Sequence, residues 1–333
     1  MKKVKTGTYI SEGLKHLFLE NDKLRIVVLP EIGGKMIRLS SQKTQRQYLL
    51  EPQNRNGSYH RPFYGAVFEN YDTSGFDECF PTISESVYPF PVNNENIIFP
   101  DHGEVWSVPW NYSFTGSILE LSVAGKKFNY EFRKEITLQD NQISIRYSLI
   151  NLYDQPFYYI WSAHPLLKVT PGDQIFLSTN VEQLFLNWAS ESRLGMFGDK
   201  VPWPIIDSKH PRLDYSVVQE KSLAQAIKGF TNRLEESSAA VYFHNSGESL
   251  VFESSDPGNN YLGLWLCYGG WPEQGDMKHL TVAIEPCSGR PDTLEEAVRR
   301  GEAAVVQSQE KRSWQLDIKL ETGVPSKLAT HSK

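Results

Sequence analysis

Regular alternation of apolar and polar residues is the feature that most constrains what this chain can fold into. In segments 143–149 and 314–320 every second residue is apolar, and the residues between are polar. Successive side chains of a β-strand point to opposite faces, so this pattern is typical of a strand with one face buried. We predict further strands at 24–29, 35–40, 118–123, 128–138, 157–161, 239–243, 250–253, 261–267 and 280–285.

Turn-forming residues separate these segments. Gly, Pro, Asn and Asp gather at 124–126, 140–141, 171–173, 245–247 and 256–258. Many short strands with frequent turns predict an all-β sandwich or barrel of antiparallel strands rather than βαβ units. Helices are predicted at 293–300, with Asp292 as the N-cap, and at 222–228, while 187–211 is predicted to be a long loop.

Length and charge limit the number of domains and the kinds of partner. The 333 residues show no repeat and no interdomain linker, so we predict a single domain spanning 1–333. The formal net charge is -6, and no run of Lys or Arg is longer than a pair. Because a phosphate-binding surface normally needs an excess of basic residues, this charge argues against a nucleic-acid partner.

Cysteine usage and the N-terminus bear on the cellular setting. The three cysteines Cys79, Cys267 and Cys287 fit no zinc-binding spacing. The basic residues 1–7 are not followed by the apolar core of a signal peptide, and no segment is long and apolar enough to cross a bilayer. We therefore expect a cytoplasmic protein without a metal, a cofactor or a membrane partner, existing as a monomer or a weak dimer.

Three ionisable residues stand at the ends of apolar, strand-like segments. They are His102, His164 and Glu285, and each is followed at once by Gly or Pro, which stops regular structure. A histidine and a carboxylate from distant parts of one chain are the minimum set for acid–base chemistry near neutral pH. The structural alternatives are a turn histidine, a core histidine bonded to a backbone carbonyl, and an exposed carboxylate at a rim.

Other residues are candidates for binding a polyhydroxylated ligand. Asp77 and Glu78 are adjacent acids in a loop bounded by Gly and Pro, where they could bind hydroxyl groups or a metal, or be solvated. His102 could donate a hydrogen bond to a sugar hydroxyl, with Trp106 nearby to cover the apolar face of a sugar ring. Trp271 is a further candidate for sugar binding.

Together, these segments resemble the aldose 1-epimerase (galactose mutarotase-like) superfamily. The sequence Pro-Asp-His-Gly at 100–103 looks like that family's first histidine motif, and His-Pro-Leu at 164–166 is similar to its second. Ile-Glu-Pro at 284–286 looks like its glutamate motif. The turn at 29–34 and the C-terminal strand to residue 320 are also similar to the family, so the resemblance spans most of the chain.

The resemblance implies a β-supersandwich with an open cleft and the activity of an isomerase that interconverts sugar anomers. It implies Glu285 as the general base, His164 as the general acid and His102 as a substrate-binding residue. Ring opening removes a proton from the anomeric hydroxyl and donates one to the ring oxygen, so one base and one acid are enough. We expect the two catalytic side chains to lie roughly 5–8 Å apart across the sugar ring.

Departures from the family pattern leave other functions open. Relatives commonly carry Gly-Arg after the segment that corresponds to 80–81, whereas this chain has Ser84 and Glu85 there. If Glu85 faces the cleft, neutral or amino sugars should be preferred over sugar phosphates. The alternatives are a glycoside hydrolase or lyase, with Asp77 or Glu78 facing Glu285, and a carbohydrate-binding protein without turnover.

Overall fold

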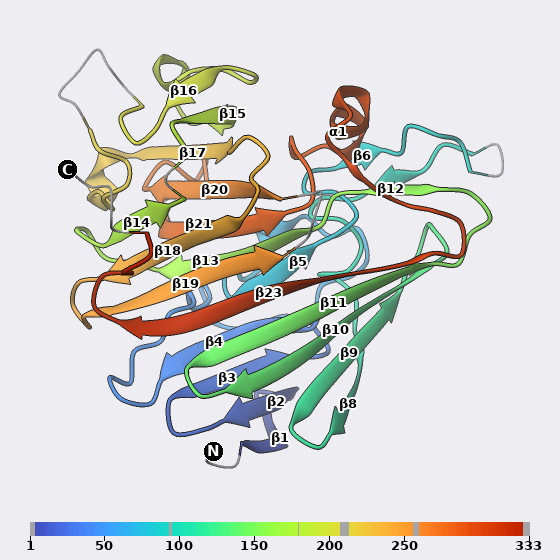
Figure 1. Ribbon diagram of the computed structural model, residues 1–333, viewed down its shortest axis with the longest axis horizontal. Coiled ribbons are helices and arrows are strands. Elements are labelled where there is room, and N and C mark those ends of the chain that lie inside the picture. The colour runs from blue at the N-terminus through green and yellow to red at the C-terminus, as the bar shows by residue number, and fades with distance from the viewer. Residues whose placement is uncertain (1–3, 93–94, 179, 207–212, 256–259, 329–333) are drawn as a thin grey trace.

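Two large antiparallel sheets build the molecule, so the predicted all-β class is confirmed (Figure 1). The structure is a computed structural model and describes residues 4–92, 95–178, 180–206, 213–255 and 260–328. The larger sheet contains, in spatial order, β1 (Lys5–Ser11), β2 (Leu14–Glu20), β3 (Leu24–Leu29), β4 (Lys35–Ser41), β5 (Phe76–Cys79), β13 (Ser162–Lys168), β21 (Leu280–Cys287), β20 (Tyr261–Tyr268), β17 (Gln225–Phe230), β15 (Gln183–Ala189) and β16 (Lys200–Pro202).

The smaller sheet lies across from the larger one (Figure 1). It contains, in spatial order, β14 (Gln174–Leu177), β18 (Ser237–Phe243), β19 (Glu248–Ser255), β23 (Lys311–Thr322), β11 (Gln142–Asn151), β10 (Tyr130–Gln139), β9 (Ile118–Ala124) and β8 (Asn111–Thr115). The remaining elements are the pairs β6 (Ser86–Val87) with β7 (Ile98–Phe99) and β12 (Phe157–Tyr159) with β22 (Ala304–Val306), the 3-10 helices η1 (Phe68–Asn70), η2 (Ser192–Leu194) and η3 (Lys221–Leu223), and α1 (Leu294–Arg300).

The alternating segments form the strands that the sequence predicts. In segments 143–149 of β11 and 314–320 of β23 the apolar residues are buried, and the polar residues between them are half-buried or exposed. Their apolar faces join one core with side chains of β2, β3 and β21 from the other sheet. The core between the sheets therefore accounts for the alternation. Among the described residues, every helix is too short or too polar to span a bilayer.

Three local predictions need correction. Segment 222–228 is not a helix: η3 is followed by β17, whose six residues are all buried, so this strand has no alternation to reveal it. Helix α1 begins at Leu294 with Thr293 rather than Asp292 as its N-cap, although Gly301 ends it in the left-handed conformation as expected. Segment 187–211 holds the end of β15 together with η2 and β16. Residues 207–211 and the turn at 256–258 lie outside the described residues.

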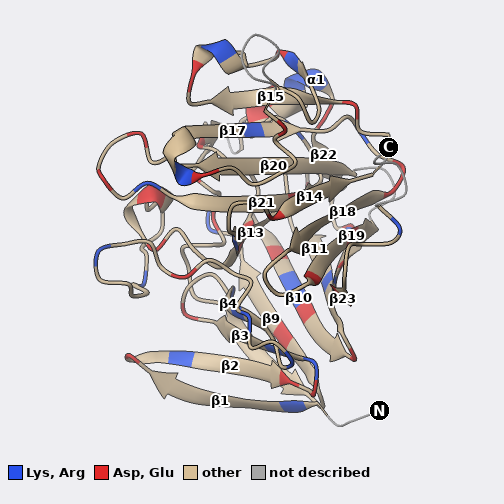
Figure 2. Cartoon of the chain, turned by 90° about the vertical axis from the view of Figure 1, so that its left-hand side faces the viewer, with Lys and Arg blue, Asp and Glu red and all other residues tan. Residues whose placement is uncertain are grey.

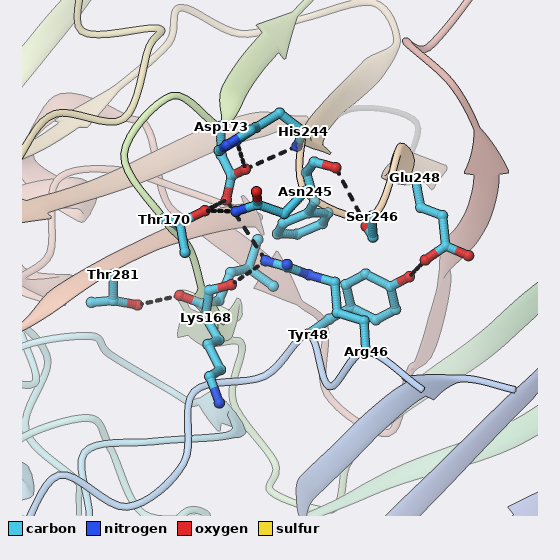
Figure 3. Close-up of polar contacts among 12 residues, drawn as sticks. Arg46, Tyr48, Lys168, Thr170, Asp173, His244, Asn245, Ser246, Glu248 and Thr281 are labelled. Carbon is cyan, nitrogen blue, oxygen red and sulfur yellow. Dashed lines mark hydrogen bonds and ion pairs between the residues drawn. The ribbon is translucent and has the colours of Figure 1, made fainter. Parts of the chain in front are cut away.

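Polar contacts fix the end of the larger sheet to the smaller one (Figure 3). The carboxylate of Glu248, at the start of β19, accepts hydrogen bonds from the hydroxyl groups of Tyr48, Ser41 and Thr44. Nearby, the buried Asp173 accepts hydrogen bonds from the backbone amide and ring of His244. Because each carboxylate has several donors, its burial is compensated. The contacts of Glu248 join β4 and the segment after it to the smaller sheet, whereas those between Asp173 and His244 lie within the smaller sheet.

Buried lysine–carboxylate pairs occupy the middle of the larger sheet. The neighbouring residues Asp77 and Glu78 of β5 are both fully buried and point to opposite faces. Lys35 pairs with Asp77 at 3.1 Å and with Asp72 on one face. On the other face Lys134 of β10 reaches across the core to Glu78 at 3.1 Å. These pairs neutralise carboxylates that would otherwise be very costly to bury.

Replacing Lys35 with Met should lower the free energy of unfolding by about 3–5 kcal/mol at pH 7.5, because it leaves Asp72 and Asp77 buried without their cation. Burial raises the pKa of Asp77 to about 6, although Lys35 opposes the shift. The loss should therefore shrink as the pH falls to 5 and the carboxyl groups take up protons. Urea denaturation at both pH values measures it. The exposed Lys23→Met is the control and should change stability by no more than about 0.5 kcal/mol.

Candidate active site

A cavity of about 640 Å³ opens on the face of the larger sheet that points away from the smaller sheet. In β21, Val282 and Ile284 belong to the core between the sheets, so Glu285 points to the opposite face. Strands β13, β21, β20, β17 and β15 lie side by side in the larger sheet (Figure 2). Each of them contributes at least one residue to the lining of the cavity. The cavity is lined by Val67, Phe68, Glu69, Asn70, Ile83, Ser84, His102, His164, Leu166, Trp188, Lys228, Trp265, Trp271, Glu273, Gln274, His279, Glu285 and Asp292.

Pairing of β13 with β21 brings His164 and Glu285 together. Ser162 lies opposite Cys287 and Leu166 opposite Ala283, so the register between them places His164 across from Glu285. Nε2 of His164 is 3.8 Å from Oε1 of Glu285. This is closer than the expected separation of roughly 5–8 Å. The two side chains therefore lie beside each other at one point of the cavity rather than on opposite sides of a space the size of a sugar ring.

The two oxygens of the Glu285 carboxylate have different surroundings. Oε2 forms an ion pair with Nζ of Lys228 and lies 3.5 Å from the hydroxyl of Ser162. Oε1 is buried and has no hydrogen-bond partner in the described part of the chain. A buried carboxylate oxygen is normally hydrogen-bonded. Oε1 is therefore the atom of this site best placed to accept a hydrogen bond or a proton from a ligand.

A glycine makes the contact between Lys228 and Glu285 possible. Glu285 and Lys228 lie on β21 and β17, with β20 between them, and Gly263 of β20 is opposite Glu285. A Cβ atom at Gly263 would lie 3.1 Å from Oε2 of Glu285 and 3.1 Å from the ring of Phe230. A larger residue would therefore crowd the carboxylate. The lysine can cross the middle strand because no side chain stands there.

His164 is held as a neutral imidazole. Its side chain is buried, and burial lowers its pKa well below the ordinary value, with a further contribution from the positive charges of His102, Lys228 and Lys35. The carboxylate of Glu285 at 3.8 Å acts in the opposite direction but does not reverse the shift. Only a small fraction of the folded protein carries the imidazolium form at neutral pH.

His102 is fixed at the cavity wall by its loop and by an aromatic neighbour. Its Nδ1 lies 2.9 Å from Oδ1 of Asp101, and its ring stacks on Phe68 with centroids 4.2 Å apart. The side chain is 18% exposed, so its ring can reach a ligand. The loop is tight after His102, because a Cβ atom on Gly103 would lie 2.1 Å from the carbonyl oxygen of Phe80.

Lys228 and Asp292 also line the cavity, although the sequence predicts other roles for them. Lys228 lies in the predicted helix 222–228, and its position among the apolar residues of 226–230 is the sequence signal of a buried charge. Asp292 is predicted to be a helix cap. Its Oδ2 accepts a hydrogen bond from Asn187 at 2.8 Å, while its enclosed Oδ1 has no partner among the described residues. Burial raises the pKa of Asp292 to about 6, and the charge of Lys228 opposes the shift.

Of the candidate residues, the structure brings His102, His164, Trp271 and Glu285 into one cavity. Asp77 and Glu78 do not line it. Both are fully buried beneath the site, where Asp77 pairs with Lys35, and Glu78 accepts hydrogen bonds from Lys134, Tyr147 and Trp161. Their placement corresponds to charge pairing inside the fold rather than to ligand contact, and it differs from the solvated loop that the sequence also allowed.

Glu85 does not have the position that the sequence hypothesis required. Ser84 lines the cavity, whereas Glu85 is exposed and lines a separate surface depression beside α1. Just before Glu85, the backbone amides of Ile83 and Ser84 both donate hydrogen bonds to the carbonyl oxygen of Asp292. Any preference for neutral sugars must therefore come from other charges in the cavity.

Three residues of the site come close enough together to hold a metal ion. Cys79, His102 and His164 each offer one ligand atom, and these atoms lie within 4.8 Å of one another. A thiol binds metals as the thiolate. Burial, reinforced by the negative charge of Glu285, raises the pKa of the Cys79 thiol well above its ordinary value. A metal ion bound here would have to displace the proton of the Cys79 thiol.

Solved structures of other proteins share this fold over nearly their whole lengths. The Slr1438 protein from Synechocystis sp. PCC 6803 matches with a TM-score of 0.69 and 16% identity, over 97% of this chain and 98% of that chain. A galactose mutarotase-like protein from Clostridium acetobutylicum matches with a TM-score of 0.67 and 13% identity, over 96% and 99% of the two chains. A galactose mutarotase-like protein from Lactobacillus casei ATCC 334 matches with a TM-score of 0.65 and 14% identity, over 92% and 100%.

No protein-family model matches the chain. Each of these structures nevertheless matches almost the full length of this chain, and two of them are galactose mutarotase-like proteins. The chain therefore has the galactose mutarotase-like fold.

His279 of the cavity wall should make stability depend on pH. Its side chain is 4% exposed, and burial, together with the charge of Lys221, lowers its pKa from 6.5 to about 4. The unfolded chain binds a proton near pH 6.5 that the folded chain binds only near pH 4, so His279 reduces stability as the pH falls through this window. In this window, the free energy of unfolding of His279→Gln should rise relative to that of the unmodified protein by about 1.4 kcal/mol for each unit that the pH falls.

Urea denaturation of the two proteins between pH 7.5 and 5 measures this difference. His60→Gln, which removes an exposed histidine outside the cavity, is the matched control. A difference between the His279 variant and the unmodified protein that stays constant across the range would contradict the prediction.

Proposed function

We propose that this protein is a carbohydrate mutarotase of the aldose 1-epimerase type, which interconverts the anomers of an aldose by ring opening. The observation that supports this most strongly is the asymmetry of the Glu285 carboxylate. Lys228 holds one oxygen, while the other has no partner among the described residues and lies 3.8 Å from His164. A carboxylate that is oriented but not saturated is suited to act as a general base.

Ring opening and ring closure each move two protons. Oε1 of Glu285 accepts the proton of the anomeric hydroxyl while the bond between C1 and the ring oxygen breaks, and the ring oxygen takes a proton from the general acid. The open-chain aldehyde then rotates about the bond between C1 and C2. The reverse transfers close the ring on the other face, so the base and the acid are both restored.

His164 is the general acid in this proposal, and Lys228 holds the base. Because the pKa of His164 is lowered, its imidazolium form is scarce at neutral pH but is a strong acid. Lys228 is the more abundant cation: burial lowers its pKa, but Glu285 and Asp292 outweigh burial and raise it overall. A lysine with a raised pKa gives up its proton reluctantly, so its better role is to keep Glu285 ionised and in position.

The remaining polar groups of the cavity suit a ligand with many hydroxyl groups. Oδ1 of Asp292 and Nδ1 of His164 and His279 are enclosed and lack hydrogen-bond partners among the described residues. Sugar hydroxyls can both donate to the carboxylate and bond to the imidazole nitrogens. The unpaired groups therefore favour a sugar over an apolar ligand, for which their burial would remain uncompensated.

Glu285→Gln should slow anomer interconversion by about 10²- to 10⁴-fold while sugar binding is retained, because an amide keeps the shape of the side chain but cannot accept the hydroxyl proton. Polarimetry of freshly dissolved α-D-glucose, corrected for the spontaneous reaction, measures the rate. Glu12→Gln is the control, because Glu12 lies in an exposed turn that is distant from Glu285 in the sequence. An unchanged rate in the Glu285 variant would assign the base to another group.

One observation supports glycoside hydrolysis as a second candidate function. Hydrolysis usually needs two carboxyl groups flanking the scissile bond, and the cavity contains Asp292 as well as Glu285. Release of nitrophenol from aryl glycosides distinguishes the two chemistries, because a mutarotase leaves these substrates intact. Sugar binding without either reaction would support a binding protein.

The charges in the cavity should disfavour sugar phosphates. Four carboxylates line it, namely Glu69, Glu273, Glu285 and Asp292, and the only lysine in the described lining, Lys228, is already paired. We expect glucose 6-phosphate to be used on the order of ten-fold less efficiently than glucose at low ionic strength. NMR exchange spectroscopy between the anomers of each sugar measures both rates. A preference for the phosphate would contradict this account of the cavity charges.

A further inference from the structure

Three tryptophans gather at one end of the cavity. Trp188 and Trp265 lie with ring centroids 5.8 Å apart and planes inclined by 34°, and Trp271 meets Trp265 edge-on at 6.0 Å. All three are partly exposed, although tryptophan is among the most costly side chains to leave in water. The mechanism proposed above uses none of them. Their exposure therefore calls for a ligand that covers them.

Strand register sets the distance of this cluster from the reacting groups. Trp188, Lys228 and Trp265 lie opposite one another on β15, β17 and β20, so they form one row across the sheet. Gly263, opposite Glu285, is two residues from Trp265 along β20. Two residues along a strand span roughly 7 Å, which is comparable to the size of one pyranose ring. The aromatic row therefore begins about one sugar ring away from the general base.

The edge of the cluster is held by a backbone hydrogen bond and carries polar groups. The backbone amide of His279 donates to the carbonyl of Trp271 at 2.8 Å, and the His279 ring packs edge-on against the indole at 4.9 Å. Glu273 and Gln274 follow Trp271 and line the cavity beside it. Flat aromatic faces with hydrogen-bonding side chains at their edge match a sugar ring, which has apolar C–H faces and a rim of hydroxyl groups.

The size of the cavity also favours a ligand larger than one sugar ring. Its volume of about 640 Å³ is far more than a single hexose fills. It falls in the range of roughly 300–1,000 Å³ that is typical of sites enclosing larger ligands. If one sugar ring sits at Glu285 and His164, space remains over the tryptophans for a second ring.

We propose that Trp188, Trp265 and Trp271 form a subsite for a second sugar unit, so that the preferred substrate is the reducing end of a disaccharide or a longer oligosaccharide. This inference rests on the proposed function for its first ring. The second ring must extend away from the anomeric carbon, and C4 and C6 lie across the pyranose ring from C1. Sugars linked through O4 or O6 of the reducing unit therefore fit, and their added binding energy raises kcat/KM.

Binding and turnover test this subsite separately. Titration of Glu285→Gln protein with glucose, galactose, maltose, cellobiose and lactose, followed by calorimetry and tryptophan fluorescence, measures affinity without turnover. At least one disaccharide should bind about ten-fold more tightly than its reducing monosaccharide and change the fluorescence. In the otherwise unmodified protein, the same disaccharide should show the higher kcat/KM for anomer exchange.

Substitutions in the aromatic row test its role. Adding Trp265→Ala, or in a second protein Trp188→Ala, to Glu285→Gln should reduce the ratio of disaccharide to monosaccharide affinity to about one, and Trp265→Phe should restore part of it. Tyr9→Ala removes a 38% exposed aromatic ring on β1, at the other edge of the sheet, and should leave the ratio unchanged. Thermal melting shows which variants fold. If Trp265→Ala does not fold, the Trp188→Ala and Trp265→Phe variants test the subsite instead.

The outcomes separate the subsite from the proposed function. Equal affinity for disaccharides and monosaccharides, or a ratio that survives loss of the tryptophans, would overturn the subsite even if monosaccharide anomers exchange. Tryptophan-dependent binding of a disaccharide without any anomer exchange would support the subsite and contradict the mutarotase function.

Discussion

Pairing of buried carboxylates with lysines is the constraint on which the larger sheet depends. Asp77, Glu78 and Glu285 are all fully buried in its central strands, and each pairs with a lysine from a different strand: Lys35, Lys134 and Lys228. These three are the buried lysines of the described residues. Burying a carboxylate without a cation costs much free energy of folding. The strands that carry the lysines must therefore lie within reach of these carboxylates. The pair of Lys134 with Glu78 also joins the two sheets.

The same kind of pair has a different consequence at the cavity. Glu78 has donors for both of its oxygens, so it can only hold the fold together. Glu285 shares one oxygen with Lys228 and leaves the other for a ligand, next to a histidine that burial keeps neutral. Glu78 and Glu285 therefore differ in two respects, which are whether the hydrogen bonding of the carboxylate is complete and whether the residue lines the cavity. Gly263 permits this arrangement because it adds no side chain between the pair.

Chain-break signals marked His102, His164 and Glu285, although the structure places His164 and Glu285 inside β13 and β21, with Pro165 and Pro286 as strand residues. Local alternation predicted β3, β4, β9 to β12, β18 to β21 and β23, but not β13, which carries His164. These signals are visible because alternation and chain breaks involve neighbouring residues. Long-range pairing is not visible in this way. The lysine partner of Glu78 is 56 residues distant along the chain, so Glu78 read as a loop acid. Strand β17 is buried on both faces and shows no alternation, so the sequence predicts a helix at Lys228 and does not reveal its pairing with Glu285.

The central claim is that Glu285 and His164 open and close a sugar ring. NMR saturation transfer between the α and β anomers of a panel of aldoses and reducing disaccharides, with catalytic amounts of the protein, tests it most directly. Our account predicts transfer well above the spontaneous rate for at least one neutral sugar, and loss of that transfer when Glu285 is replaced with Gln. Binding of these sugars with no transfer above the spontaneous rate in any of them would contradict it.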